Sequence, residues 1–231
     1  MSISENIAAV RDGIAAACRA AGRDPREITL VGASKMNDAS RCRQAIAAGI
    51  DALGENRVQE LTEKWEEHAY DGAPLHFIGH LQRNKVRQVV GKAALIQSAS
   101  SEALLLEIEK RAAALGIRQQ VLLEVNIGGE AAKSGFAPEA LEGAAAAALS
   151  LPHVAVLGLM TIPPAAVAPG QNVPYFEKMY RLYVDTNRNM FHNEMKYLSM
   201  GMSGDYADAI RCGSNMVRVG TAIFGARHYE I

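Results

Sequence analysis

The sequence has little of what marks secreted, membrane-spanning or disulfide-stabilised proteins. Its 231 residues include only three cysteines, Cys18, Cys42 and Cys212, which lie far apart and form no CxxC pair. Such sparse thiols are typical of reduced proteins. No stretch approaches the roughly 20 apolar residues that span a bilayer, and the N-terminus lacks the uninterrupted apolar core of a signal peptide. We therefore expect a cytoplasmic protein without a membrane segment.

The charge balance excludes a second group of functions. Twenty-four basic and 25 acidic residues give a formal net charge of −1, without the basic excess of nucleic-acid-binding proteins. The six histidines are scattered along the chain. His76 and His80 are four residues apart, but the residues between them predict a strand end and not a helix, so we expect no metal site.

Short apolar runs alternate with longer amphipathic segments. The apolar runs predict eight strands, at residues 28–33, 51–53, 75–78, 95–97, 120–125, 154–158, 197–199 and 216–219. The amphipathic segments predict helices at 39–48, 58–68, 83–90, 102–115, 139–149, 175–187 and 206–211, after an extra N-terminal helix capped by Ser4. Gly22, Gly49 and Gly116 stand where helices should end, and Ser101 stands where one should begin.

This alternation implies parallel strands joined by right-handed crossovers. Eight such units can close into a barrel, so we predict an α/β protein in which residues 1–231 form a single (β/α)8 TIM barrel with an extra N-terminal helix. An open doubly wound sheet remains an alternative, because a sequence does not show closure. Its dinucleotide-binding version is disfavoured, since no GxGxxG follows the first strand.

Lys35 directly follows the apolar run ITLVGAS, which contains the first predicted strand, and so lies at the end of a barrel where ligands bind. The amine of a lysine in this place can form a Schiff base with an aldehyde. Taken alone, such a residue is more often a solvated lysine at the end of a strand. The role of Lys35 must therefore be judged together with the residues that follow the other predicted strands.

The segments after the seventh and eighth strands predict a phosphate site. Ser203 and Gly204 lie in the first of these segments, and Gly220 and Thr221 lie in the second. Small residues let backbone N–H groups approach an anion, and these two loops commonly bind phosphate in such barrels. Each loop alone could be an ordinary tight turn. Together with Lys35 they indicate a phosphorylated aldehyde as the ligand.

Seven stretches of the chain, in order over nearly its whole length, carry a family resemblance. They are LVGASK at 30–35, LGENRVQEL at 53–61, HFIGHLQRNK at 76–85, EVNIGGEAAKSGF at 124–136, GLMTIPP at 158–164, LSMGMSGDYADAI at 198–210 and MVRVGTAIFGAR at 216–227. They resemble the pyridoxal 5′-phosphate (PLP) homeostasis proteins, the YggS/PROSC family. The resemblance implies a barrel like the N-terminal domain of alanine racemase, and PLP held as a Schiff base on Lys35. It also implies a role in vitamin B6 homeostasis that could include delivery of PLP to apo-enzymes.

The resemblance also implies positions around the cofactor. It places the phosphate among Ser203, Gly204, Gly220 and Thr221, the pyridine nitrogen opposite Arg218, and the ring near Asn56, with His80 and Met160 lining the pocket. The chain departs from the family pattern at 36–38, after the lysine, and at Asn215, where a threonine is usual. The loop at 165–173 is also individual, and no role is assigned to it.

The implied position of Arg218 bears on catalysis. PLP stabilises a carbanion best when its pyridine nitrogen is protonated, which a permanently charged guanidinium disfavours. We also expect no counterpart of the second domain that supplies a catalytic tyrosine in alanine racemase, and the local candidates, Tyr206 and Tyr229, lack motif support. We therefore expect a monomeric PLP carrier without efficient turnover. The alternatives are a PLP-dependent amino-acid racemase and a Schiff-base aldolase acting on a sugar phosphate.

Overall fold

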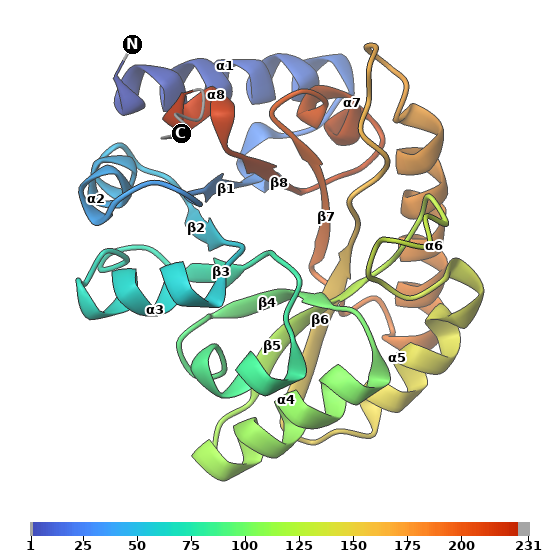
Figure 1. Cartoon of the computed structure of the whole chain (residues 1–231). Helices are drawn as coiled ribbons and strands as arrows, with labels where there is room; N and C mark the ends of the chain where they lie inside the picture. Colours follow the sequence, from blue (N-terminus) through green and yellow to red (C-terminus); the bar gives the residue numbers. More distant parts are fainter. Residues whose placement is uncertain (1, 226–231) are drawn as a thin grey trace.

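The computed structural model describes residues 2–225, in which eight parallel strands close into a barrel (Figure 1). The strands follow one another in sequence order, and β1 pairs with β8 to close the sheet. They are β1 Thr29–Ala33, β2 Ala52–Glu55, β3 Leu75–Phe77, β4 Leu95–Ala99, β5 Gln119–Glu124, β6 Val154–Met160, β7 Tyr197–Met202 and β8 Met216–Val219. The predicted barrel is confirmed, and the open sheet is wrong.

The helices surround the strands. They are α1 Ile3–Ala20, α2 Ala39–Ala47, α3 Val58–Glu66, α4 Glu102–Leu115, α5 Leu141–Leu149, α6 Val173–Met190, α7 Tyr206–Arg211 and α8 Thr221–Phe224, with short 3-10 helices η1 Pro25–Glu27, η2 Arg83–Gln88 and η3 Pro138–Ala140. Ser101 caps α4, and Gly116 ends it in the left-handed conformation, as predicted. None of the helices within residues 2–225 is long and apolar enough to cross a membrane.

The extra N-terminal helix α1 packs outside the barrel, against α7 and α8. Its buried face includes Ile7 and Val10, which are three residues apart. The prediction that Ser4 caps this helix is wrong. Ser2 Oγ accepts the N–H of Glu5 at 3.2 Å, and the Glu5 carboxylate accepts the N–H of Ser2 at 2.7 Å. This reciprocal capping box satisfies two N–H groups at the helix start, which Ser4 cannot do from inside the first turn.

The prediction of a helix at 83–90 is wrong in the type of helix and in its length. It forms the shorter 3-10 helix η2, in which the Lys85 N–H donates to the Gln82 carbonyl at 2.9 Å. Val86 is its one buried residue. Since most helical stability in proteins comes from packing of an apolar face, a segment that buries one side chain has little to support an α-helix.

Two layers of side chains fill the structure. Successive strand residues point alternately into the barrel and towards the helices. Outward residues such as Leu30 and Leu53 form the main core together with the helices. A smaller inner cluster contains Val31, Ala52, Leu95, Leu122, Met160 and Met216. Further inward positions carry buried polar side chains, among them His76, Gln97, Glu124, Ser199 and Arg218.

Candidate functional site

A cavity of about 250 Å³ opens at the carboxyl ends of β1, β7 and β8. Six of the seven residues predicted for the site line it, namely Lys35, Ser203, Gly204, Arg218, Gly220 and Thr221, together with Ala33, Asn37, Met202, Phe224 and Gly225. This is the end of a barrel where ligands bind. The structure thus brings together side chains from both ends of the sequence, and their role as ligands of a cofactor stays a prediction.

Lys35 lies in a loop that is fixed on both sides of it. The Asn37 side-chain amide donates to the Lys35 carbonyl at 3.0 Å, and the Asn37 N–H donates to the Ser34 carbonyl at 3.1 Å. Met36 has a positive φ of 60°, a conformation that costs a non-glycine residue on the order of 1 kcal/mol. The loop that departs from the family pattern at 36–38 is therefore a tight, hydrogen-bonded turn that presents Lys35 to the cavity.

Ser203 and the start of α8 form a second part of the cavity wall. Ser203 Oγ accepts the N–H of Gly220 at 3.2 Å and the N–H of Ala222 at 3.4 Å. Gly204 and Thr221 adjoin these residues in the chain and also line the cavity. Because Ser203 Oγ accepts both N–H groups, its own O–H can point into the cavity and donate to an oxygen of a bound anion.

Arg218, on β8, is 3% exposed, and two acceptors hold its guanidinium. Nη2 donates to the Thr161 carbonyl at 2.9 Å, and Nη1 donates to Ser199 Oγ. Burial lowers the pKa of Arg218 to about 10, while the carboxylates of Glu124 and Asp205 act in the opposite direction. The guanidinium is therefore cationic at neutral pH and can donate hydrogen bonds to the cavity but accept none.

Asn56, the seventh predicted residue, does not line the cavity. It directly follows β2, and its Oδ1 is buried without a hydrogen-bond partner among the described residues. Its backbone lies against Gly79, where a Cβ would be 2.2 Å from the Asn56 carbonyl oxygen. His80 and Met160 do not line the cavity either. His80 is exposed, and Met160 belongs to the inner cluster.

Sequence reasoning missed four side chains of the cavity wall, Ala33, Asn37, Met202 and Phe224. Met202 immediately precedes the predicted Ser203, and Asn37 is two residues from Lys35. The available signal was therefore their position in the chain close to these predicted residues. Phe224 lies in α8, a helix of four residues, which is too short to show a periodic pattern.

Tyr206, one of the two tyrosines considered as catalytic bases, does not line this cavity. Tyr206 points towards α1, because a Cβ on Gly13 would be 2.1 Å from its hydroxyl oxygen. Tyr229 lies outside the described residues. Within residues 2–225, no group of three or more His, Cys, Asp or Glu side chains is arranged to hold a metal ion.

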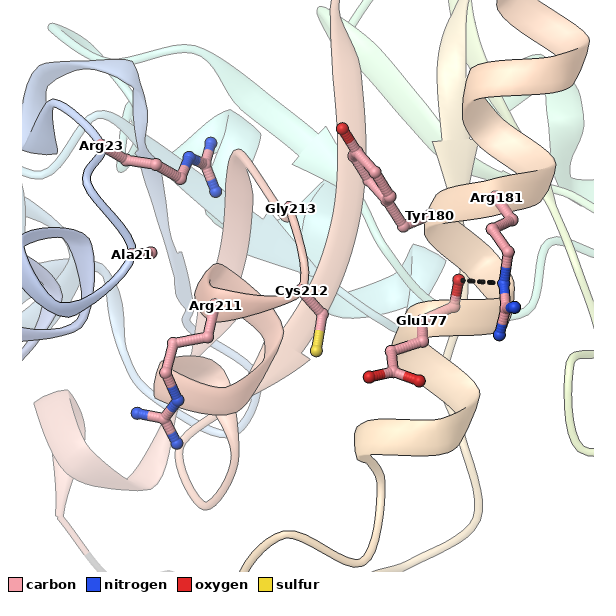
Figure 2. A pocket seen from close by; sticks show the side chains of 8 residues that line it. All are labelled: Ala21, Arg23, Glu177, Tyr180, Arg181, Arg211, Cys212 and Gly213. Atoms are coloured by element: carbon pink, nitrogen blue, oxygen red, sulfur yellow. Dashed lines mark hydrogen bonds between the residues drawn. The ribbon is translucent and has the colours of Figure 1, made fainter.

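A larger cavity, of about 660 Å³, lies between the end of α1, helix α6 and the turn after α7 (Figure 2). Its lining residues Ala21 and Arg23 precede β1, and Cys212 and Gly213 precede β8. It therefore lies near the amino ends of the strands, where residues of such barrels usually contribute to stability and not to catalysis. Its three arginines, Arg23, Arg181 and Arg211, each already donate to a carbonyl or carboxylate of the protein. We therefore place the functional site at the smaller cavity.

Comparison with known proteins identifies close relatives along the whole chain. Residues 6–228 match the family model described as alanine racemase, N-terminal domain. A protein of Aquifex aeolicus named pyridoxal phosphate homeostasis protein is 43% identical over 229 residues, which cover 99% of this chain and 100% of that protein. The chain therefore has full-length relatives with this name.

Solved structures agree with the sequence comparison. PipY of Synechococcus elongatus, with PLP bound, is 29% identical with a TM-score of 0.84, over 97% of this chain and 100% of that chain. An alanine racemase of Clostridium difficile has a TM-score of 0.70 at 16% identity, over 99% of this chain and 58% of that chain, which is a likeness of fold alone. This chain belongs to the alanine racemase N-terminal domain family and, within it, to the pyridoxal phosphate homeostasis proteins.

Proposed function

We propose that the cavity binds PLP and that the amine of Lys35 forms a Schiff base with its aldehyde. The observation that carries this proposal is the meeting of Lys35 with Ser203 and Gly220 in one small cavity. An amine suits an aldehyde, and hydroxyl and N–H donors suit a phosphate. The PLP-bound structure of PipY, which is 29% identical, supports the same ligand.

The residues around Lys35 fit the separate parts of PLP. The phosphate would lie among Ser203, Gly204, Gly220 and Thr221, and the pyridine nitrogen would face Arg218. Asn56 does not line the cavity, so its position near the ring stays a prediction from the family resemblance. Its buried Oδ1 has no hydrogen-bond partner within the described structure.

We propose a carrier and regulator of PLP that lacks efficient turnover. When bound, PLP supplies an aldehyde and an electron-withdrawing ring, and the ring withdraws best when its nitrogen is protonated. Arg218, with a pKa of about 10, keeps its own proton at neutral pH and disfavours a second positive charge beside it. The name that the relatives share, pyridoxal phosphate homeostasis protein, supports a carrier.

The cellular part of the proposal is a cytoplasmic monomer that holds reactive PLP and delivers it to apo-enzymes. Cys18 and Cys42 are buried free thiols, as expected where the environment is reducing. Light scattering on the purified protein would give its mass. Mixing PLP-loaded protein with an apo-enzyme, against an equal amount of free PLP, would show whether delivery is direct.

Absorbance spectroscopy with borohydride trapping tests the binding proposal. PLP added to the protein should give a Schiff-base band, and borohydride followed by peptide mass mapping should place the modification on Lys35. Lys35→Ala should lose both signals, and Lys110→Ala, which changes an exposed lysine on α4, should keep them. A wild-type protein that neither carries nor takes up PLP would overturn the proposal.

A PLP-dependent racemase is the second candidate, because the barrel has the fold of alanine racemase. Tyr206, which faces α1, is poorly placed to act as its base. Incubation with single enantiomers of amino acids and chiral analysis would decide between the two. Turnover that disappears in Lys35→Ala would favour the racemase.

A further inference from the structure

A buried ionic cluster lies next to the loop that carries Lys35. Lys64 Nζ, on α3, is 2.7 Å from Glu55 Oε1 at the end of β2 and 3.5 Å from Glu60 Oε2. The side chains of Lys64, Glu55 and Glu60 are 8%, 0% and 18% exposed. None of the three lines the cavity, so a direct role in ligand binding does not explain them.

The cluster contacts the backbone on both sides of Lys35. On the N-terminal side, Lys64 Nζ donates to the Ser34 carbonyl at 2.9 Å, and Ser34 Oγ donates to Glu55 Oε1 at 2.6 Å. On the C-terminal side, Glu60 Oε2 accepts the N–H of Met36 at 2.7 Å. The two residues that flank Lys35 are thus bound to one connected group of charges.

Stability alone is a weak explanation for such a cluster. Taking charges out of water costs free energy that their mutual attraction often fails to exceed, and buried ion pairs can frequently be replaced by apolar residues without loss. The cluster does, however, hold Met36 at its positive φ of 60°. A non-glycine residue adopts this conformation only where surrounding contacts enforce it. Its specific effect is therefore on the geometry of the loop.

We infer that Glu55, Glu60 and Lys64 are positioning residues that fix the direction in which Lys35 enters the cavity. The inference rests on the proposed function, in which the Lys35 amine must meet an aldehyde whose phosphate is held elsewhere in the wall. A ligand anchored at one end leaves the amine little freedom in position. Contacts that hold the peptide groups before and after Lys35 supply that constraint without touching the ligand.

Glu60 offers the most direct test of the inference, because one substitution of it removes the contact with the loop and another keeps it. Glu60→Ala removes the acceptor of the Met36 N–H. Glu60→Gln keeps an oxygen acceptor there and removes the charge. Glu66→Ala changes an exposed glutamate on the same helix and serves as the matched control. The measurements are PLP affinity by absorbance titration, trapping at Lys35 by borohydride, and hydrogen exchange of the Met36 amide without ligand.

Glu60→Ala should weaken PLP binding on the order of tenfold, as expected for a hydrogen bond to a charged group. Its Met36 amide should exchange faster, while Glu60→Gln should restore most of the affinity and Glu66→Ala should behave as wild type. Lys64→Met, which removes the bond to the Ser34 carbonyl, should reduce trapping in the same direction. Melting of each ligand-free protein identifies any variant that does not fold.

The outcomes separate the inference from the proposed function. Equal affinity and trapping in wild type and Glu60→Ala would overturn the inference and leave the proposed function intact. A loss that Glu60→Gln does not restore, or an equal loss in Glu66→Ala, would also overturn it, because helix damage would then be the cause. A wild type that traps no PLP would refute the proposed function. Slow exchange of the Met36 amide that depends on Glu60 would still show that Glu60 holds the loop.

Discussion

The guanidinium of Arg218 donates to the hydroxyl of Ser199, and this contact fixes a chain of hydrogen bonds across the inside of the barrel. Because the guanidinium of an arginine can only donate hydrogen bonds, Ser199 Oγ must accept from it. The Ser199 hydroxyl then donates to Gln97 Oε1 at 2.6 Å. The Gln97 amide nitrogen then donates to His76 Nδ1 at 3.0 Å, which leaves the proton of neutral His76 on Nε2. Strands β8, β7, β4 and β3 are thus joined by groups with one consistent set of donors and acceptors.

Ser199→Ala should destabilise the protein, because it removes an acceptor of Arg218 and the donor to Gln97 at once. We expect a loss on the order of 2–4 kcal/mol in the free energy of unfolding, as for buried polar groups left unsatisfied in a network. Urea unfolding measures it. Ser150→Ala, which removes an exposed hydroxyl, is the control and should change little. A small effect of Ser199→Ala would mean that water replaces the hydroxyl.

His76 should make the protein less stable in mild acid. Burial lowers its pKa from 6.5 to about 4. The unfolded chain therefore binds a proton as the pH falls through 6.5, and the folded protein does not until about pH 4. Stability is fully present above pH 6.5 and is lost progressively between these values. The loss from this group should be about 2 kcal/mol between pH 7 and pH 5.

Urea unfolding at pH 7 and pH 5 measures this contribution of His76. His76→Gln removes the titrating group, so the fall in stability between the two pH values should be smaller than in wild type by about 2 kcal/mol. Ser150→Ala, at an exposed side chain that does not titrate, should leave the fall unchanged. The same pH dependence in wild type and His76→Gln would show that other groups cause it.

The barrel and six of the residues that line its cavity could be predicted because their signals are local. A strand in a parallel barrel is buried on both faces, so it appears as a short apolar run between amphipathic helices. The residue after such a run faces the ligand end of the barrel, which located Lys35 and Gly220. The glycines predicted to end helices have positive φ values in the structure, as at Gly49 and Gly116.

The remaining features depend on contacts that no local pattern carries. Glu60 and Lys64 look like an ordinary pair four residues apart on a helix, and only the fold brings them to the Lys35 loop. Arg218 could be placed in the cavity, but its bond to Ser199 joins two different strands. The cap is different, because Ser2 and Glu5 have the S-x-x-E spacing of a capping box, and the prediction of Ser4 overlooked this local signal.

The capping box of α1 gives a direct test of that correction. Ser2→Ala should lower the free energy of unfolding by about 1 kcal/mol, the usual effect of losing an N-cap side chain. Ser4→Ala should change it much less, because Ser4 lies inside the helix. Thermal unfolding of the two variants, with wild type as reference, measures the difference. A larger effect at Ser4 would restore the original prediction.

Ser203 should contribute to binding of the phosphate and not of the aldehyde. Its hydroxyl lies where the N–H groups of Gly220 and Ala222 converge, so it would contact the phosphate end of PLP. Ser203→Ala should weaken PLP binding by about tenfold, since a hydrogen bond to a charged group is lost. The half-buried position makes a large effect on folding unexpected.

Pyridoxal, which has the aldehyde and ring but no phosphate, is the matched ligand for the Ser203 test. Borohydride trapping of pyridoxal at Lys35 should be the same in wild type and Ser203→Ala, while trapping of PLP at low concentration should fall. The ratio of the two affinities therefore isolates the phosphate contact from any general damage to the cavity. If the substitution weakened both ligands equally, Ser203 would shape the cavity without holding the phosphate, and the anion would have to be held by Thr221 and the backbone alone.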